Sequence, residues 1–215
     1  MPLTRPLVLL LCGALAGCNV LGAVASKLPK PEIQAAYKGL AGKSVGIMVW
    51  ADKSVLMDWP NLQVDTANNV INKLLAAQAA EVKDLKSTTY PYPPASYVKY
   101  QKEHPETDVQ PVTQFAGKLG VQRLIYIEVN DLSTRADGGA VLFLGNIAVT
   151  LKIIEIDDKG VGTVAFSENI KKQFPDKAPK EGILNAADRT MYLGSVNAVT
   201  TEIVKRLIQH PDDDA

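Results

Sequence analysis

Cysteine and histidine are scarce in this sequence of 215 residues, and neither sign of charge is in excess. The two cysteines, Cys12 and Cys18, both stand near the N-terminus, so the rest of the chain cannot form a disulfide, a cysteine-based metal site or a cysteine nucleophile. Lysine and arginine total 23, as do aspartate and glutamate. That balance gives no sign of the clustered basic surface that binding to nucleic acid requires. A 47% share of hydrophobic residues nevertheless predicts a packed core, which must be stable without crosslinks.

Motifs that would carry catalysis are equally sparse. His104 and His210 are each followed by proline, and neither belongs to a metal-binding spacing such as HExxH. Gly160-Val161-Gly162 lacks the third glycine and the following helix of a phosphate-binding loop. The adjacent carboxylates Asp157 and Asp158 fall in the same segment and have the residue type of an exposed turn. We therefore predict no catalytic residue, no metal site and no cofactor.

The N-terminus, by contrast, has the anatomy of a secretory signal. A short segment with one positive charge, Met1–Arg5, precedes an apolar run over Leu7–Leu15, and two small residues then precede Cys18. The apolar run is too short to span a bilayer, which takes ~20 apolar residues. These features predict a signal peptide over residues 1–17.

The tetrapeptide Leu15-Ala16-Gly17-Cys18 resembles the lipobox of bacterial lipoproteins. The resemblance implies that Cys18 becomes the first residue of the mature chain and carries lipid, whose several acyl chains anchor a protein stably to a membrane. Asn19, in place of aspartate, implies sorting to the outer membrane with the domain facing the periplasm. The alternative is an ordinary signal peptide whose cleavage leaves a cysteine at the new N-terminus.

Behind the signal, the sequence predicts a tether, one domain and a tail. Residues 18–42 contain small and polar residues and two prolines, which indicates a lipidated tether with at most a short helix over 32–40. Extended at ~3.3–3.6 Å per residue, such a tether reaches at most ~80 Å. The domain is expected over 43–208, and residues 209–215 form an acidic tail.

Hydrophobic periodicity predicts the elements of the domain. The strand over 141–156 alternates apolar and polar residues, which is typical of a sheet covered on one face. In the strand over 161–170, Val164, Phe166 and Ile170 are expected on one face. In the last helix, Glu202 lies four residues before Arg206 and is expected to pair with it. The expected order is a strand over 44–50, a helix that begins at 58–60, a strand over 82–85, short helices over 95–103 and 111–119, strands over 121–129, 141–156 and 161–170, and a helix over 184–208.

This order predicts an α/β (α+β) fold, a single domain in which a mixed sheet of about five strands has helices packed against it. Two segments carry a family resemblance: Phe115–Val129, where a helix ends in Leu-Gly-Val and runs into a strand, and Leu151–Asp157, a strand that leads into a hairpin. The pattern resembles the domain shared by the curli secretion lipoprotein CsgG, the N-terminal domain of TolB and the penicillin-binding-protein activator LpoB. The resemblance implies a protein that binds partners or assembles and is not an enzyme. Only Ala140–Leu144 could enter a membrane as a hairpin strand, so we do not expect a pore.

Two segments are candidates for contact with a partner protein. The first carries four tyrosines among prolines, and tyrosine is enriched at protein interfaces; its alternative is a stiff loop whose tyrosines cover the domain's own core. The second is a strand start that is apolar on both faces, to be covered by a helix of the same chain, by a partner or by the membrane surface. The candidate residues are Tyr90, Tyr92, Tyr97, Tyr100, Leu142, Phe143 and Leu144.

Taken together, the sequence predicts a periplasmic lipoprotein, anchored to the outer membrane through lipid on Cys18, that binds another envelope protein as an assembly or activator component. One alternative is a homo-oligomeric secretion or scaffold component of the CsgG kind, which requires a self-complementary surface. A periplasmic hydrolase is the other alternative. The expected partners are the membrane and either an envelope protein or a second copy, without nucleic acid.

Overall fold

The computed structural model of the protein describes residues 31–136 and 141–212. The signal peptide, Cys18 and the last three residues lie outside the described residues. The described chain belongs to two units, one that includes residues 31–33 and 211–212 and a main unit from Gln34 to His210. The elements are β1 (Glu32–Ile33), β2 (Val45–Ala51), α3 (Lys53–Asp58), α4 (Leu62–Ala79), η1 (Lys83–Leu85), α5 (Pro94–Glu103), η2 (Pro105–Asp108), α6 (Val112–Phe115), η3 (Ala116–Leu119), β3 (Arg123–Arg135), β4 (Phe143–Ile156), β5 (Gly162–Phe174), α7 (Asp188–Leu207) and β6 (His210–Pro211).

The main unit is built on a four-stranded mixed sheet in the order β2-β3-β4-β5, and β1 with β6 forms a separate two-stranded sheet. Strand β2 runs parallel to β3, whereas β3, β4 and β5 are successively antiparallel. The parallel pair is possible because α3 to η3 lie between β2 and β3 in the sequence and provide the crossover. The mixed α/β class expected from the sequence is confirmed.

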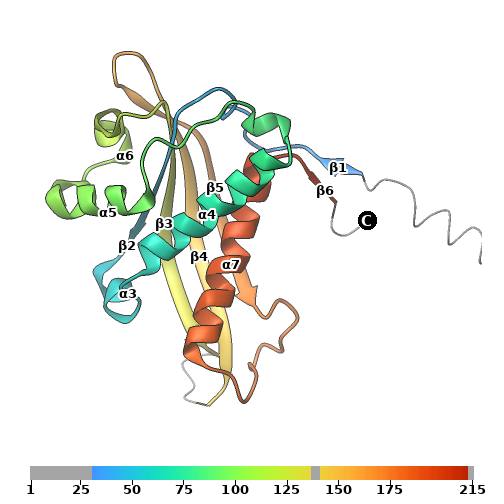
Figure 1. Ribbon diagram of the computed structural model, residues 1–215. Helices are drawn as coiled ribbons and strands as arrows, with labels where there is room; N and C mark the ends of the chain where they lie inside the picture. The colour runs from blue at the N-terminus through green and yellow to red at the C-terminus, as the bar shows by residue number, and fades with distance from the viewer. Residues whose placement is uncertain (1–30, 137–140, 213–215) are drawn as a thin grey trace, which may run out of the picture. The chain divides into compact units, whose positions relative to one another are not determined.

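Helices α4 and α7 cover one face of the sheet, and α5 and α6 lie on the other side (Figure 1). The sequence pattern predicted a dry face formed by Val141, Phe143, Ile147, Val149, Leu151 and Ile153. On the face beneath α4 and α7 the last four are buried, which confirms the period-two pattern there, whereas Phe143 is half-buried and Val141, before β4, is 66% exposed. The two helices complete the core with apolar side chains at helical spacing. Core residues on this face include Ile47, Val49, Ile125, Ile127, Ile147, Val149, Leu151, Ile153, Val70, Leu74, Val199 and Ile203.

The opposite face is covered over one end only. There Phe115, Ala116 and Leu119 pack on Leu124 and Ile154 in a second apolar cluster. Gly120 has φ 68°, the left-handed conformation that ends the predicted helix over 111–119 and turns the chain into β3. Farther along β3, beyond the bulge at Asn130, the same face carries the polar side chains of Asp131 and Ser133.

Two predicted elements differ from the structure. Residues Val82–Leu85 were expected to form a strand, but Lys83–Leu85 form a 3₁₀ turn in which only Leu85 is fully buried. Asp58 was expected to begin a helix, but it ends the short α3, which Asp52 caps through a 2.8 Å hydrogen bond from the Ser54 amide. The following helix starts at Leu62.

A bulge in β5 corrects a third prediction. Phe166 pairs with Ile153, and Val164 pairs with Ile154, so Ala165 has no partner and the register shifts. Phe166 packs on the cluster beneath α7, whereas Val164 borders a pocket on the opposite face. The two side chains therefore do not share one face.

The segment before β2 is part of the main unit and contains no helix over 32–40. Leu40 is fully buried and Tyr37 is 8% exposed. The Tyr37 amide donates to Arg206 O at 3.0 Å, and Thr88 Oγ1 donates to Leu40 O at 2.9 Å. The compact unit thus begins at Gln34, earlier than the boundary expected at residue 43. Among the described helices, none is both long and apolar enough to cross a membrane.

Candidate binding face

The half of the second sheet face that α5 and α6 leave uncovered carries almost only polar side chains. The register places Asp131, Ala148 and Lys171 in one row across β3, β4 and β5. Asn146 and Gln173 form the adjacent row. These side chains border a hollow of about 690 Å³. We call this surface the open face; its residues are Asn130, Asp131, Asn146, Ala148, Thr150, Asn169, Lys171 and Gln173.

A bulge and two hydrogen bonds organise the open face. The register of β3 shifts between Val129 and Asp131, which makes Asn130 the extra residue. Asn130 Nδ2 donates to Thr150 Oγ1 at 2.8 Å, and Thr150 Oγ1 donates to Asn169 Oδ1 at 2.8 Å. This ladder links three strands and fixes the orientation of both amides. The face is therefore an array of amides with one hydroxyl, one carboxylate and one ammonium group, in which Asn130, Thr150 and Asn169 are held by hydrogen bonds.

A smaller hollow of about 390 Å³ lies on the same face, toward η2 and α6. Within it, Lys152 Nζ lies 2.8 Å from both carboxylate oxygens of Glu128, and Trp50 Nε1 donates to Asp108 Oδ1 at 3.3 Å. Burial, together with the charges of Glu128 and Asp108, raises the pKa of the Tyr126 hydroxyl. The carboxylates already have donors and the phenol keeps its proton, so the arrangement suits binding better than proton transfer.

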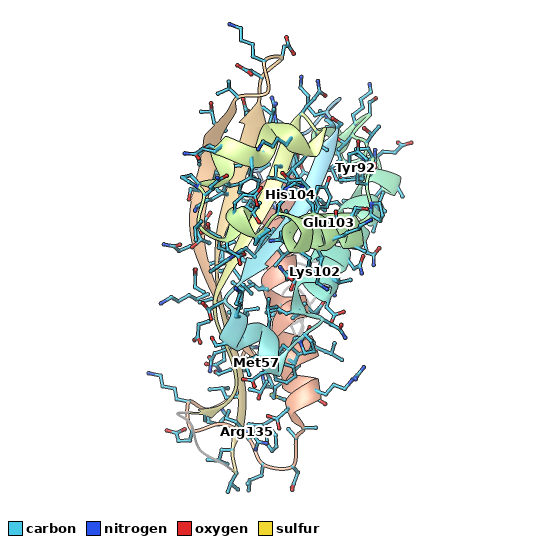
Figure 2. The ribbon with its side chains drawn as sticks, turned by 90° about the vertical axis from the view of Figure 1, so that its left-hand side faces the viewer. Met57, Tyr92, Lys102, Glu103, His104 and Arg135 are labelled. Atoms are coloured by element: carbon cyan, nitrogen blue, oxygen red, sulfur yellow. The ribbon has the colours of Figure 1, made fainter. Side chains whose placement is uncertain are left out.

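Of the four tyrosines predicted as a contact surface, Tyr92, Tyr97 and Tyr100 border one pocket, and Tyr90 is not among its lining residues. Tyr97 is 4% exposed, and the hydroxyls of Tyr90 and Tyr97 are buried without a hydrogen-bond partner among the described residues. Burial raises the pKa of Tyr90 to about 12. Tyr92 is 44% exposed and meets the Tyr97 ring edge-on, whereas Tyr100 lies against the His104 ring. Tyr92 and His104 are on one side of the main unit (Figure 2). Two of the four tyrosines thus serve the core, as the alternative predicted, and two reach the surface.

The apolar strand start pairs through its backbone with a loop of the same chain. Phe143 exchanges two backbone hydrogen bonds with Ile183, of 2.8 and 2.9 Å. The Arg135 guanidinium lies 3.8 Å from the centre of the Phe143 ring, and Leu144 is 5% exposed. Arg135 lies toward the end of the sheet remote from Tyr92 (Figure 2). Leu142 and Phe143 are half-buried and Val141 is 66% exposed, so part of this segment is accessible.

One sequence match to a catalytic motif has a structural explanation. Residues Gly42-Lys43-Ser44-Val45-Gly46 fit GxSxG, the pattern of a nucleophile that stands between a strand and a helix. Here Ser44 precedes strand β2, and its Oγ accepts a 3.0 Å hydrogen bond from the Gln122 amide. The serine joins the starts of two neighbouring strands. Over residues 31–136 and 141–212, no group of three or more histidine, cysteine or acidic side chains could hold a metal ion.

The open face itself was not among the sequence predictions. The sequence did contain a pattern that indicates a polar face, because Asn146, Thr150 and Lys152 alternate with the apolar positions of β4. Alternation alone, however, does not say whether helices cover the polar positions.

Comparison with known proteins adds distant structural likenesses only. No family model matches the sequence, so the resemblance to the CsgG, TolB and LpoB domain stays a prediction. No curated protein matches either. The PelC dodecamer from Paraburkholderia phytofirmans is 10% identical, with a TM-score of 0.42 over 79% of this chain and 91% of that chain. Lipoprotein GNA1162 from Neisseria meningitidis is 15% identical, with a TM-score of 0.39 over 75% and 97%. The hypothetical protein CT253 from Chlamydia trachomatis is 13% identical, with a TM-score of 0.44 over 77% and 95%. Likenesses this distant carry no argument about what this chain binds or does.

Proposed function

We propose that this protein is a lipid-anchored component of the bacterial envelope that acts by binding another envelope protein and not by catalysis. The anchor is proposed from the sequence Leu15–Cys18, with lipid on Cys18 and the domain facing the periplasm from the outer membrane. The observation that carries the binding role is the open face, a polar array on an otherwise packed sheet, with a hydrogen-bonded ladder of Asn130, Thr150 and Asn169.

The chemistry of the open face favours a protein partner. Interfaces that form and dissociate are about as polar as the rest of a protein surface, and they use direct hydrogen bonds at their rims. Fixed amides such as Asn130 and Asn169 offer both donors and acceptors, while Asp131 and Lys171 provide one charge of each sign. Because the ladder is already ordered, binding would lose little side-chain entropy.

A short tether would keep this surface close to the membrane. The main unit starts at Gln34, so a tether from Cys18 has ~16 residues and an extended reach of roughly 55 Å. Confinement to this range raises the effective concentration of a membrane-bound partner without any new contact.

Metabolic labelling tests the anchor. Cells that express the protein are grown with radioactive palmitate, and the protein is then purified and its label counted. We expect label on the natural chain and none on the Cys18→Ser variant. Label that persists in the variant would overturn the proposed attachment site.

Photocrosslinking in cells tests the binding role. A photoreactive residue replaces Asn146 on the open face, on the inner strand β4, and a matched variant carries it at Asn68, which is exposed on helix α4. We expect a discrete adduct with one envelope protein at position 146 and none at position 68. Equal adducts at both positions, or none at position 146, would contradict a partner on the open face.

A self-associating scaffold is the second candidate. One specific observation favours it, the unpaired edge of strand β5.

A further inference from the structure

The two edge strands of the main sheet differ in whether other parts of the chain already bond to their outward backbone groups. Among the described residues β5 pairs with β4 only, although it is 13 residues long. An edge strand of this length presents a row of backbone groups that can pair with another strand. At the other edge, Val49 O of β2 accepts hydrogen bonds from Gln63 Nε2 at 2.9 Å and Gln101 Nε2 at 3.2 Å, and the Val45 amide donates to Thr89 O at 2.8 Å. The β2 edge is thus closed by its own chain.

This difference limits how the sheet can be extended by a second copy. A head-to-tail array would require the β5 edge to pair with the β2 edge, which is closed. Pairing of β5 with β5 requires a two-fold axis, and the two strands are then antiparallel. We propose that the β5 edge binds the β5 edge of a second copy of this chain, with Ile170 opposite Ile170.

The faces of β5 restrict the register. The bulge at Ala165 leaves a regular stretch over 166–174, in which alternate residues face α7 or the open face. In paired strands, residues that lie opposite each other point to the same face of the sheet. Each face of one subunit therefore continues into the same face of the other only if even-numbered residues lie opposite even-numbered ones and odd-numbered residues opposite odd-numbered ones.

Charge then selects among these registers. With Ile170 on the axis, Glu168 lies opposite Lys172 twice, once on each side of the axis. Phe166 lies opposite Phe174, and Asn169 lies opposite Lys171. Opposite charges and aromatic pairs stabilise neighbouring strands, whereas like charges in direct opposition destabilise them.

The neighbouring registers lack this complementarity. An axis at Glu168 opposes two glutamates, and an axis at Lys171 opposes two lysines. An axis at Asn169 places Glu168 opposite Ile170 and Lys172 opposite Phe166, which leaves both charges without an opposite partner. The sequence of this stretch is therefore self-complementary about Ile170.

The charged side chains involved are already held in place beneath this edge. Lys172 Nζ lies 3.0 Å from Glu202, Glu202 lies 2.7 Å from Arg206 Nη1, and Arg206 Nε lies 3.0 Å from Glu168. Burial raises the pKa of Glu202, but the hydrogen bond from Lys172 and the nearby charges outweigh that effect and hold its pKa below the ordinary value. In the dimer, this row of four charged side chains and the same row of the second copy would meet at the two-fold axis, with positive and negative charges alternating along them.

The inference does not depend on the lipid anchor or on the partner of the proposed function. If the dimer forms, the sheet becomes continuous across the axis and two open faces lie side by side. If it does not form, the binding role of a single open face is unaffected, so the two proposals fail separately.

Charge reversal tests the pairing. Full-length chains with Glu168→Lys or with Lys172→Glu are purified, and sedimentation velocity is measured for the natural chain, each variant alone and an equal mixture of the two variants. In either variant alone both opposed pairs become repulsive, and the dimer dissociation constant should rise about tenfold or more.

In the mixture each lysine at position 168 faces a glutamate at position 172, and each original glutamate faces an original lysine, so dimers should return. Changes within one subunit are the same alone and in the mixture, so a loss of folding cannot imitate this recovery. A natural chain that stays monomeric, or a mixture that stays monomeric, overturns the proposal.

Disulfide formation provides an independent test that leaves the charges of Glu168 and Lys172 in place. In a Cys12→Ser, Cys18→Ser background, chains with Asn169→Cys are mixed with chains with Lys171→Cys and oxidised. Opposite Cβ atoms lie ~4.5–5.5 Å apart, close to the range of a disulfide. We expect efficient crosslinking in the mixture, little in either chain alone, and none with Thr163→Cys, an exposed control beyond the bulge. Efficient crosslinking of Asn169→Cys with itself, or equal crosslinking of the control, overturns the register.

Discussion

At the scale of single residues, glycine sets the distance between helix α7 and the sheet. A Cβ atom on Gly145 would overlap Ser195 Oγ and would lie 3.0 Å from Met191 O, a backbone atom of α7. Strand β4 and the helix can pack this closely only because position 145 has no side chain. Close approach here also explains the burial of the small Ser195 side chain on α7.

Gly145→Ala should therefore destabilise the protein. The helix must move away from β4, and overpacking of this kind costs about 1–3 kcal/mol in the free energy of unfolding. Urea denaturation followed by circular dichroism measures this loss. Adding Ser195→Gly should restore part of it, because one of the overlapping atoms is then absent. An unchanged unfolding midpoint for Gly145→Ala would show that the contact is loose.

Asp188, at the start of α7, controls a pH-dependent contribution to stability. Hydrogen bonds from Arg135 and Thr134 lower the pKa of its carboxyl group below the ordinary value. A carboxylate whose pKa is lower in the folded state stabilises the fold above its unfolded pKa of ~3.9. That contribution is lost as the pH falls through the lower, folded value.

Asp188→Asn should accordingly be less stable than the natural chain at pH 7, by less than about 1 kcal/mol because the side chain is partly exposed. The difference should disappear in strong acid, where the natural carboxyl is protonated. Urea unfolding at a series of pH values measures it. Asp176→Asn, at an exposed loop position, is the control. A difference that persists unchanged into strong acid would point to packing and not to charge.

At the scale of elements, the β2 edge is closed by side chains of the same chain, whereas the β5 edge is open to another strand. Gln101 is 8% exposed and, with Gln63, satisfies a carbonyl group that no neighbouring strand reaches. Loss of both donors leaves Val49 O without these partners, and an unsatisfied buried carbonyl costs ~1–3 kcal/mol.

The double variant Gln63→Leu/Gln101→Leu should thus lower the free energy of unfolding by that amount. It should also acquire a tendency to associate, because the β2 edge becomes available for pairing. Chemical denaturation and sedimentation velocity report the two effects. Gln110→Leu, at an exposed position, is the control. It should change the free energy of unfolding by no more than about 0.5 kcal/mol and should not make the protein associate. A double variant as stable as this control would show that water replaces the side chains.

At the scale of the whole main unit, the segment before β2 is structural. Tyr37 and Leu40 are buried, and the Tyr37 amide donates to Arg206 O near the end of α7. Tyr37 Oη donates to Glu155 at 2.7 Å and accepts from Arg123 at 2.9 Å. The segment joins the C-terminal end of α7 to the neighbouring ends of β3 and β4.

A chain that begins at Gln34 should unfold at the same urea concentration as the Cys18→Ser chain, whereas a chain that begins at Lys43 should be far less stable. Removing two buried side chains costs ~1.5–3 kcal/mol each, or about 4 kcal/mol in total. Comparison of the three denaturation curves measures this difference. Equal stability of the two truncated chains would place the domain boundary at residue 43, where the sequence alone suggested it.

Local pattern was sufficient for much of the fold. Strand β4 and helix α7 are long enough for their periods of two and 3.6 to show, and Glu202 pairs with Arg206 as the i,i+4 spacing predicted. Short elements failed because a few apolar residues fit more than one structure. Val82 and Leu85 suggested a strand, whereas Leu85 alone is buried and Asp84 accepts a hydrogen bond from the Gln209 amide.

The sequence by itself determined the predicted signal at Leu15–Cys18, the mixed α/β class and the inward faces of β4 and α7, because these depend on neighbouring residues. Tertiary structure decided that Tyr97 belongs to the core, that the backbone of Phe143 pairs with Ile183, and which half of the sheet and which edge strand are open. Those outcomes depend on contacts between segments far apart in the chain, and on how far a helix extends over a sheet, which no local period encodes.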